Sequence, residues 1–385
     1  MKLVVVSHTP HYRSAAGTVG WGPTVREIDH LAELFQEIVH VAPLHEGVAP
    51  EGALPYSSAR VRVVAVRPAG GEGAKDKLGI LLRAPGWARA ILREVTVADF
   101  LHVRCPAGIS LVTLALLPFV RGDVKRWIKY AGNWKPDGSE PWSYRLQRRW
   151  LLSDRTRGLV TVNGEWPNQP AHVRSFLNPC LTDTELEEGR CSAAEKRTGG
   201  PVRLLFIGRL EKNKGAGHAV CILDRLLASN VAASLDLVGD GPERGIFEAL
   251  TDQLGVRHSV LFHGWRRRSE LTPLLGRAHF LLLPTVSEGW PKVLSEGMAY
   301  GAIPLAGRVS CIPQYLERFR TGRAFPAVDE QAFVDAVRWY LWHPAEWKDE
   351  SQRAVAAAEL FSYSRFLEAV RSLLDLPADI AAHTP

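Results

Sequence analysis

Short apolar runs alternate with helical patterns along the first half of this 385-residue chain. The runs have the composition of strands and read KLVVVSH, IVHVAPL, VRVVAVRP, ADFLHVRC and RGLVTVNG. Helical patterns separate them at about 24–35, 78–95, 110–120 and 141–152. Because strands that alternate with helices favour a parallel sheet with helices on both faces, the sequence predicts a doubly wound α/β fold.

The length of the chain indicates two domains, since 385 residues exceed what one hydrophobic core usually supports. The segment GRCSAAEKRTGG, residues 189–200, mixes small and charged residues without apolar periodicity, which is typical of an interdomain linker. We therefore expect a first domain over 1–190, a second over 200–360 and a terminal helical segment over 361–385.

Cysteine usage and hydropathy bear on the cellular location. The five cysteines are scattered, and they form no C-x-x-C pair and no zinc-type spacing, which favours a reducing cytoplasm. The apolar run at the N-terminus is too short for a signal peptide and reads as the first strand. No run approaches the roughly 18 apolar residues of a spanning helix. We expect a cytoplasmic protein, either free or on the inner face of a membrane.

One stretch of the second half, Pro284 to Gly301, carries two glutamates between apolar strands. A buried strand ends at Pro284, a polar loop then carries Glu288, and Glu296 lies in the helix that follows. Ligands of open α/β sheets bind at such strand ends. By spacing alone, however, two carboxylates eight residues apart are equally compatible with ordinary solvated acids.

Cations and glycines flank two other predicted strand ends. The loop RLEKNKG places Arg209 and Lys214 beside the start of a helix at about residue 216, where backbone amides and the helix dipole favour an anion. An exposed pair of cations with no ligand is the alternative. Near the N-terminus the loop AGTVGWG contains Gly17, and such a glycine loop lets the backbone approach a ligand closely.

Four segments in order resemble retaining glycosyltransferase family 4. They are the E-x7-E stretch from Glu288 to Glu296, IGRLEKNKG at 207–215, LVGDGPER at 237–244 and VLFHGW at 260–265. The resemblance covers about residues 202–316 strongly and the first 190 residues weakly. It implies the GT-B fold, in which two Rossmann-like doubly wound parallel-sheet domains face a cleft and a C-terminal helix crosses back to the N-terminal domain.

The resemblance also implies roles for individual residues of the second domain. Arg209 and Lys214 would neutralise the donor diphosphate, Glu288 would bind hydroxyls of the donor sugar, and Glu296 would hold the ribose. The remaining donor-binding positions lie in loops that contribute mainly backbone groups, and they are Gly208, Gly264, Trp265, Gly289, Trp290 and Lys292. In the first domain, the Gly17 loop would border the diphosphate and the acceptor.

One position departs from the family pattern. Many relatives carry a histidine near the point of sugar transfer, at a strand end like that of LHVRCP. Aligned by its proline, this chain has Arg104 there, with His102 two residues earlier on the same face. We name Arg104 as the candidate catalytic residue, whereas a core or surface histidine is the expected role of His102.

The predicted activity is transfer of a sugar from a nucleotide-diphosphate sugar, with UDP or GDP as the expected nucleotide, by a retaining hexosyltransferase-type enzyme. No D-x-D motif occurs in the sequence, so we expect no metal, and no cofactor besides the donor. The acceptor would be a glycan, a lipid-linked molecule or a natural product, as in polysaccharide biosynthesis. Alternatives are a sugar-nucleotide epimerase or phosphorylase of the same fold, a catalytically silent relative, and a non-catalytic basic binding protein.

The basic surplus of the chain is concentrated in one segment. Residues 121–157 hold ten Lys or Arg against four Asp or Glu, which equals the net charge of +6 of the whole chain. Four tryptophans at positions 127, 134, 142 and 150 are interleaved with these charges. This composition suits an anionic membrane surface or a phosphate-bearing acceptor, and a solvated helix with packed tryptophans is equally compatible with it. We expect no nucleic-acid partner, because no recognition motif is present.

Overall fold

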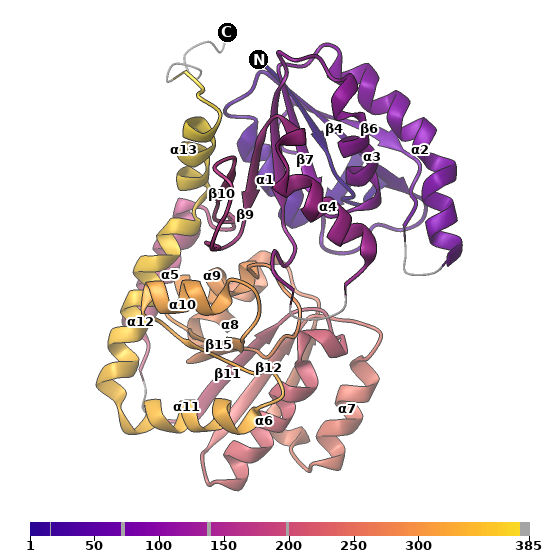
Figure 1. Ribbon diagram of the computed structural model, residues 1–385. Coiled ribbons are helices and arrows are strands. Elements are labelled where there is room, and N and C mark those ends of the chain that lie inside the picture. Colours follow the sequence, from indigo (N-terminus) through magenta and orange to yellow (C-terminus); the bar gives the residue numbers. More distant parts are fainter. Residues whose placement is uncertain (16, 71–73, 137–139, 198–199, 378–385) are drawn as a thin grey trace. The chain divides into compact units, whose positions relative to one another are not determined.

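The computed structural model describes the chain except for residues 16, 71–73, 137–139, 198–199 and 378–385 (Figure 1). Two compact units are present. The first contains Met1–Phe176 together with the C-terminal segment from Phe366, and the second is Leu177–Arg365. The last eight residues of the terminal segment expected over 361–385 lie outside the described residues.

The first unit is built on a mainly parallel sheet. Its parallel strands are β1 (Lys2–Val6), β4 (Glu37–His45), β6 (Val61–Val66), β7 (Phe100–Cys105), β8 (Lys125–Tyr130), β9 (Leu159–Val162) and β10 (Val173–Ser175). They lie in the order β6-β4-β1-β7-β8-β9-β10. β1 therefore lies between the two halves of the sheet, as in a doubly wound fold. The shorter strands β2 (His11–Ser14), β3 (Gly17–Trp21) and β5 (Ala53–Pro55) extend the sheet beyond β4.

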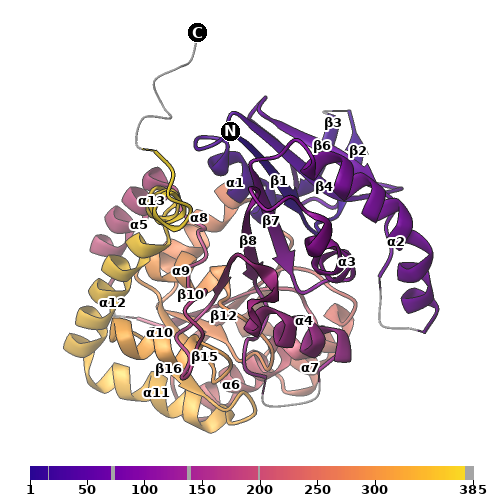
Figure 2. The same cartoon turned by 45° about the horizontal axis from the view of Figure 1, so that its top comes forward.

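Helices cover both faces of this sheet, as the alternating pattern predicts. Val4 and Val6 of β1 face a core that includes Trp87 and Leu114, from helices α2 (Ala74–Val95) and α3 (Gly108–Leu116), and Leu151 of α4 (Trp142–Leu152). Leu3 and Val5 alternate to the other face, where they join Ile28 of α1 (Gly22–Leu31). α3 contacts both α2 and α4, so the three helices form one layer (Figure 2).

The C-terminal helix, α13 (Tyr363–Leu373), returns to the first unit. This confirms the expectation that a C-terminal helix crosses back to the N-terminal domain. Phe366 is buried, and its ring centroid lies 5.9 Å from that of Phe176 and 6.4 Å from that of Trp127. Val370 and Leu374 belong to the same core as β1 and α1. Apolar burial thus fixes the last helix on a sheet formed by the beginning of the chain.

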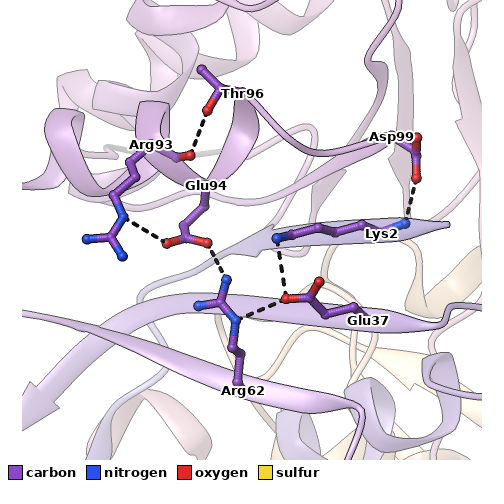
Figure 3. Close-up of polar contacts among 7 residues, drawn as sticks. All are labelled: Lys2, Glu37, Arg62, Arg93, Glu94, Thr96 and Asp99. Carbon is purple, nitrogen blue, oxygen red and sulfur yellow. Dashed lines mark hydrogen bonds and ion pairs between the residues drawn. The ribbon is translucent and has the colours of Figure 1, made fainter.

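Ion pairs join α2 to the amino-terminal edge of this sheet (Figure 3). Lys2 Nζ lies 3.3 Å from Glu37 Oε1, and Arg62 Nε donates to the same oxygen at 3.0 Å. Arg62 also pairs with Glu94 in the last turn of α2, whose carboxylate is nearly buried. The charged groups at this edge neutralise one another and hold α2 on the sheet. Ligands of this fold class bind at the opposite edge, where the strands have their carboxyl ends.

The second unit has a six-stranded parallel sheet in the order β13-β12-β11-β14-β15-β16. The strands are β11 (Val202–Ile207), β12 (Ala233–Val238), β13 (Val260–Gly264), β14 (Phe280–Leu283), β15 (Ile303–Gly307) and β16 (Arg323–Phe325). The helices are α5 (Asp183–Glu195), α6 (Ala216–Ala228), α7 (Arg244–Gln253), α8 (Arg268–Arg277), α9 (Lys292–Ala299), α10 (Ile312–Phe319), α11 (Glu330–Trp342) and α12 (Pro344–Ala358). The order again places the first strand of the unit, β11, between two halves.

The linker expected over 189–200 is wrong in its first part, because α5 extends through Glu195. A capping box starts this helix, in which Thr182 Oγ1 accepts from Glu185 N and Glu185 Oε2 accepts from Thr182 N. Lys196 then donates to the carbonyls of Leu275, Ala278 and Tyr300 at 3.2, 2.6 and 2.6 Å. Few apolar residues of α5 are buried, so apolar periodicity could not reveal it. Residues 198–199 of the expected linker lie outside the described residues.

The segment 121–157 is not a single basic surface. Its first part forms β8 inside the sheet, where Arg126, Trp127 and Lys129 are buried. Trp134 is buried as well, whereas Trp142 on α4 is 61% exposed. Residues 137–139 of this segment lie outside the described residues. Within the described part of the chain, no helix combines the length and the apolar character needed to cross a bilayer.

Candidate active site

Loops at the carboxyl edge of the second sheet are joined through their backbones. Leu210 N, after β11, donates to Asp240 O, after β12, at 3.0 Å. Gly239 N donates to Gly264 O at the end of β13 at 2.8 Å, and Val286 N, after β14, donates to Asn213 O at 3.1 Å. The loops that follow four adjacent strands therefore form one connected surface, whose position depends on main-chain atoms.

Two glycines make this close approach possible. Gly215 has φ +87°, and a Cβ added there would lie 2.1 Å from Pro284 O. Gly239 has φ +127°, and its added Cβ would lie 1.9 Å from the carbonyl oxygen of Gly208. Any side chain would separate these loops, and an L-residue is also strained at such φ values. Gly208, which the sequence names as a site residue, thus contributes its backbone to the contact between loops.

The packing of Gly215 against Pro284 brings Lys214 and Glu288 together. Lys214 Nζ donates to Glu288 Oε1, and Thr285 Oγ1 donates to Asn213 O at 3.0 Å beside them. The Lys214 and Glu288 side chains are 25% and 19% exposed. The sequence names both residues but assigns them different ligands, and it does not predict that they pair. The pair presents a cation and a carboxylate, both in reach of solvent, at the carboxyl edge of the sheet.

Arg209 follows β11 on the same loop. Its Nε donates to Glu211 Oε1 at 2.7 Å, and its side chain is 66% exposed. An ion pair this exposed is weak, so little free energy opposes a change of partner. The structure therefore leaves the Arg209 guanidinium available to a ligand.

The backbone amides named at 289, 290 and 292 lie at the start of α9. Gly289 and Trp290 are buried, and Lys292 is the first residue of the helix. The Trp290 indole stacks on Phe361 at 5.3 Å and donates to Ser295 Oγ at 2.8 Å, so its side chain belongs to the core. Pro291 precedes the helix, and Gly301, with φ +71°, follows its end.

Glu296 has a partner that the sequence does not reveal. Its carboxylate contacts Arg268 Nη1, and Arg268 Nε donates to Glu185 Oε1 at 2.8 Å. Partial burial opposes the charge of Arg268, but the carboxylates of Glu296 and Glu185 raise its pKa above the ordinary value. Arg268 thus lies between two carboxylates and is not simply solvated. Three consecutive arginines, 266–268, show no pattern that marks the last one as turned inward.

The donor-binding residues predicted at 264 and 265 lie at the end of β13 and directly after it. Gly264 ends the strand with φ +67°. The Trp265 side chain is half-buried, and among the described residues its indole has no ring partner. An aromatic face left without a protein partner is compatible with stacking on a ligand.

In the first unit, Arg104 is the second-last residue of β7, and one side of its guanidinium is held by a carboxylate. Arg104 Nη1 and Lys129 Nζ each donate to Glu27 Oε1 at 2.7 Å. The Glu27 side chain is fully buried, whereas that of Arg104 is 13% exposed. His102, by contrast, is a core residue that stacks on Trp127 at 3.8 Å. Burial, and then the charge of Arg104, hold the pKa of His102 well below its usual value.

Histidines that the sequence analysis missed lie near Arg104. His40, on β4, is bonded to Ser7 Oγ at 2.7 Å and to the Tyr56 hydroxyl at 2.6 Å. His8 follows β1 and remains in contact with water. Displacement of water by surrounding protein atoms, and then the Arg104 guanidinium, lower the pKa of His8. His8 comes two residues after the end of β1, at the carboxyl edge of the sheet, and this position is the signal that could have identified it.

The glycine loop expected before α1 is instead the hairpin β2–β3. Gly17 is the first residue of β3, with φ +94°, and its carbonyl accepts from Ser14 Oγ at 3.1 Å. Residue 16 lies outside the described residues. Gly17 thus serves the turn of the hairpin, and no described atom lies within 4 Å of its added Cβ.

Comparison with known proteins finds sequence similarity to the second unit. Residues 191–359 match the family model described as "Glycosyl transferases group 1". A glycogen synthase of Mycobacterium tuberculosis is 31% identical over 170 residues, which are 43% of this chain and 39% of that protein. The chain thus spans about two-fifths of the length of this curated relative.

Solved structures match almost the whole chain. Sucrose-phosphate synthase from Thermosynechococcus elongatus superposes with a TM-score of 0.74 at 16% identity, over 97% of this chain and 98% of that one. The Anabaena protein HepE, solved with UDP and glucose, gives 0.66 at 14% identity, over 97% and 99%. These similarities, with the two parallel sheets, show that the expected GT-B fold is present.

Gly215→Ala tests the contact between the loops. We expect the substitution to lower the free energy of unfolding by about 3 kcal/mol or more, because it combines a left-handed backbone with a clash against Pro284 O. Urea denaturation followed by circular dichroism measures the loss. The control is Gly245→Ala on α7, where nothing lies within 4 Å of the added Cβ. Equal effects of the two substitutions would contradict the proposed role of Gly215.

Proposed function

We propose that the protein is a retaining, metal-independent glycosyltransferase that moves a sugar from a nucleotide-diphosphate sugar to an acceptor. The observation that carries the proposal is the pairing of Lys214 with Glu288 at the carboxyl edge of the second sheet. The match of residues 191–359 to the glycosyl transferases supports it, as does the fold shared with a protein solved with UDP and glucose. A sugar-nucleotide epimerase and a non-catalytic basic binding protein are not favoured by these comparisons.

The chemistry requires stabilisation of a departing diphosphate. When the bond between sugar and phosphate breaks, negative charge grows on the phosphate oxygens and positive charge on the anomeric carbon. Fixed cations beside the phosphates lower this barrier. Lys214 would leave Glu288 for a phosphate oxygen, and Arg209 would exchange Glu211 for another. Glu288, once released, would accept hydrogen bonds from hydroxyls of the donor sugar and hold the anomeric carbon in position.

Retention would follow from attack of the acceptor on the face that the leaving group vacates, with a phosphate oxygen taking the proton. We expect the product to keep the anomeric configuration of the donor, and proton NMR of the first product formed measures it through the coupling constant of the anomeric proton. A product of opposite configuration would refute this mechanism and would require a protein base opposite the leaving group.

Donor binding provides the direct test. We expect UDP or GDP to raise the melting temperature with and without a chelator, since a ligand bound only to the folded state stabilises it. Metal independence is proposed from the absence of a D-x-D motif, and a nucleotide effect that disappears with the chelator would overturn it. Lys214→Ala should weaken nucleotide binding about 10- to 100-fold, the usual effect of losing a charge-assisted hydrogen bond.

The matched control is Lys212→Ala in the same loop. Lys212 is exposed and lies two residues from Lys214. Its replacement by alanine therefore changes the net charge by the same amount as Lys214→Ala but leaves the Lys214–Glu288 pair in place. Arg209→Ala should behave like Lys214→Ala. Equal affinity of the Lys212 and Lys214 variants would remove the phosphate role of Lys214, and failure of UDP, GDP and ADP alike to bind the unmodified protein would refute the proposed function.

The acceptor is proposed to be a lipid-linked molecule or a growing glycan, and a soluble natural product is the alternative. The part of segment 121–157 that supports contact with a membrane is α4. Trp142, Arg145, Leu146 and Arg149 follow the spacing of one helix face, and all four are exposed. Apolar side chains between cations suit the interface of an anionic bilayer.

Charge reversal on α4 tests this contact. We expect Arg145→Glu with Arg149→Glu to reduce binding to vesicles that contain phosphatidylglycerol by about tenfold or more, because each cation near an anionic surface contributes about 1 kcal/mol. Vesicle sedimentation measures bound protein. The control reverses two exposed cations of the second unit, Arg197 and Lys348. Equal binding of both double variants would show that α4 makes no such contact.

A further inference from the structure

We propose that Arg268 fixes the Glu296 carboxylate for the ribose of the donor, adds a hydrogen-bond donor beside it, and so lets the site distinguish ribose from 2′-deoxyribose. This inference rests on the proposed function. It extends that function by assigning sugar selectivity in the nucleotide to a residue that does not belong to the E-x7-E motif.

The first step is the contact between Arg268 and Glu296. Glu296 lies on α9, a helix of only eight residues, and its side chain is 15% exposed. Arg268 is the first residue of α8, and its Nη1 contacts Glu296 Oε1. A glutamate side chain has three rotatable bonds, so a carboxylate that must meet two hydroxyls benefits from a partner that fixes its direction.

The second step is that Arg268 is itself held from the other side. Its Nε donates to Glu185 Oε1 at 2.8 Å, while Glu185 Oε2 accepts from Thr182 N at 2.8 Å. A continuous chain of polar contacts thus runs from the start of α5 through Arg268 to Glu296. The planar guanidinium can bind two carboxylates in fixed directions at once, which the single ammonium of a lysine cannot do with the same geometry.

The third step concerns a hydrogen-bond donor that is left over. Arg268 Nη2 is buried, and among the described residues it has no hydrogen-bond partner. A buried N–H without a partner is costly, and such a group indicates that a ligand acceptor completes the site. Beside the Glu296 carboxylate it would offer a donor next to an acceptor. A hydroxyl group both donates and accepts, so this combination suits the diol of a ribose.

The neighbouring arginines support the assignment by contrast. Arg266, which precedes α8, pairs with Glu270 in the first turn of that helix at 3.3 Å, and both side chains are exposed. Arg267 is exposed as well. Arg268 is the arginine of the three that contacts Glu296, which makes Arg267→Met a matched control for Arg268→Met.

The experiment measures dissociation constants of UDP and 2′-deoxy-UDP, with GDP and ADP and their deoxy forms in parallel. We expect the unmodified protein and Arg267→Met to prefer the ribonucleotide. Arg268→Met should weaken ribonucleotide binding about tenfold and leave the deoxynucleotide nearly unchanged, because one well-placed hydrogen bond accounts for a change of that size. The ribonucleotide preference of Arg268→Lys should lie between those of the unmodified protein and Arg268→Met.

A double-mutant cycle separates positioning from a purely structural role. If Arg268 and Glu296 hold the same hydroxyls, Arg268→Met should cause a clearly smaller loss of ribose preference in a Glu296→Gln background than in the unmodified protein. An unchanged preference in Arg268→Met, or additive losses in the cycle, would overturn the inference while leaving the proposed function intact. If Arg268→Met does not fold, the ratio of the deoxynucleotide to the ribonucleotide dissociation constant is measured on Arg268→Lys instead, and a ratio equal to that of the unmodified protein would overturn the inference. Absence of nucleotide binding by the unmodified protein would overturn both proposals.

Discussion

Contact between backbones at the carboxyl edge of the second sheet is the constraint on which the candidate site depends. Gly215 approaches Pro284 so closely that no Cβ fits between them, and hydrogen bonds from Leu210 and Val286 continue this contact to the neighbouring loops. Main-chain atoms have far fewer degrees of freedom than long side chains, so they place Lys214 opposite Glu288 with little loss of entropy on ligand binding. The site is therefore a property of the sheet edge and not of any single loop.

Charge is distributed over this edge in pairs. Each glutamate of the E-x7-E motif has its own cation, Lys214 for Glu288 and Arg268 for Glu296. The two pairs differ in what holds the cation. Lys214 pairs with Glu288 and can be drawn away by a phosphate, whereas Arg268 is also bound by Glu185 on its other side and stays in place. An exchangeable pair suits a group that must move during a reaction, and a braced pair suits one that must keep its direction.

The first unit places its charges differently. Glu27 is fully buried and accepts from both Arg104 and Lys129, so a carboxylate holds the end of β7 and the middle of β8 together. Removing one partner of a buried ion pair is costly, which makes this cluster a structural device as well as a candidate surface for the acceptor. Burial, and then the Arg104 charge, lower the pKa of His8, and burial holds the pKa of His40 well below its usual value. A neutral imidazole can accept a hydrogen bond from a hydroxyl group.

The sequence by itself determined the two doubly wound sheets and the loops that carry Lys214, Glu288 and Glu296, because these follow from the alternation of strands with helices and from short motifs. The return of the last helix was expected only from the family resemblance. The sequence did not reveal β8, because Arg126 and Lys129 interrupt its apolar pattern, and their partners lie outside the strand, in the carbonyls of Thr156 and Val120 and the carboxylate of Glu27. Nor did it reveal α5, whose helix depends on caps and tertiary contacts, or the inward turn of Arg268 among three arginines. Those features were decided by the tertiary structure, since the free energy of a buried charge depends on partners that only folding brings within hydrogen-bond distance.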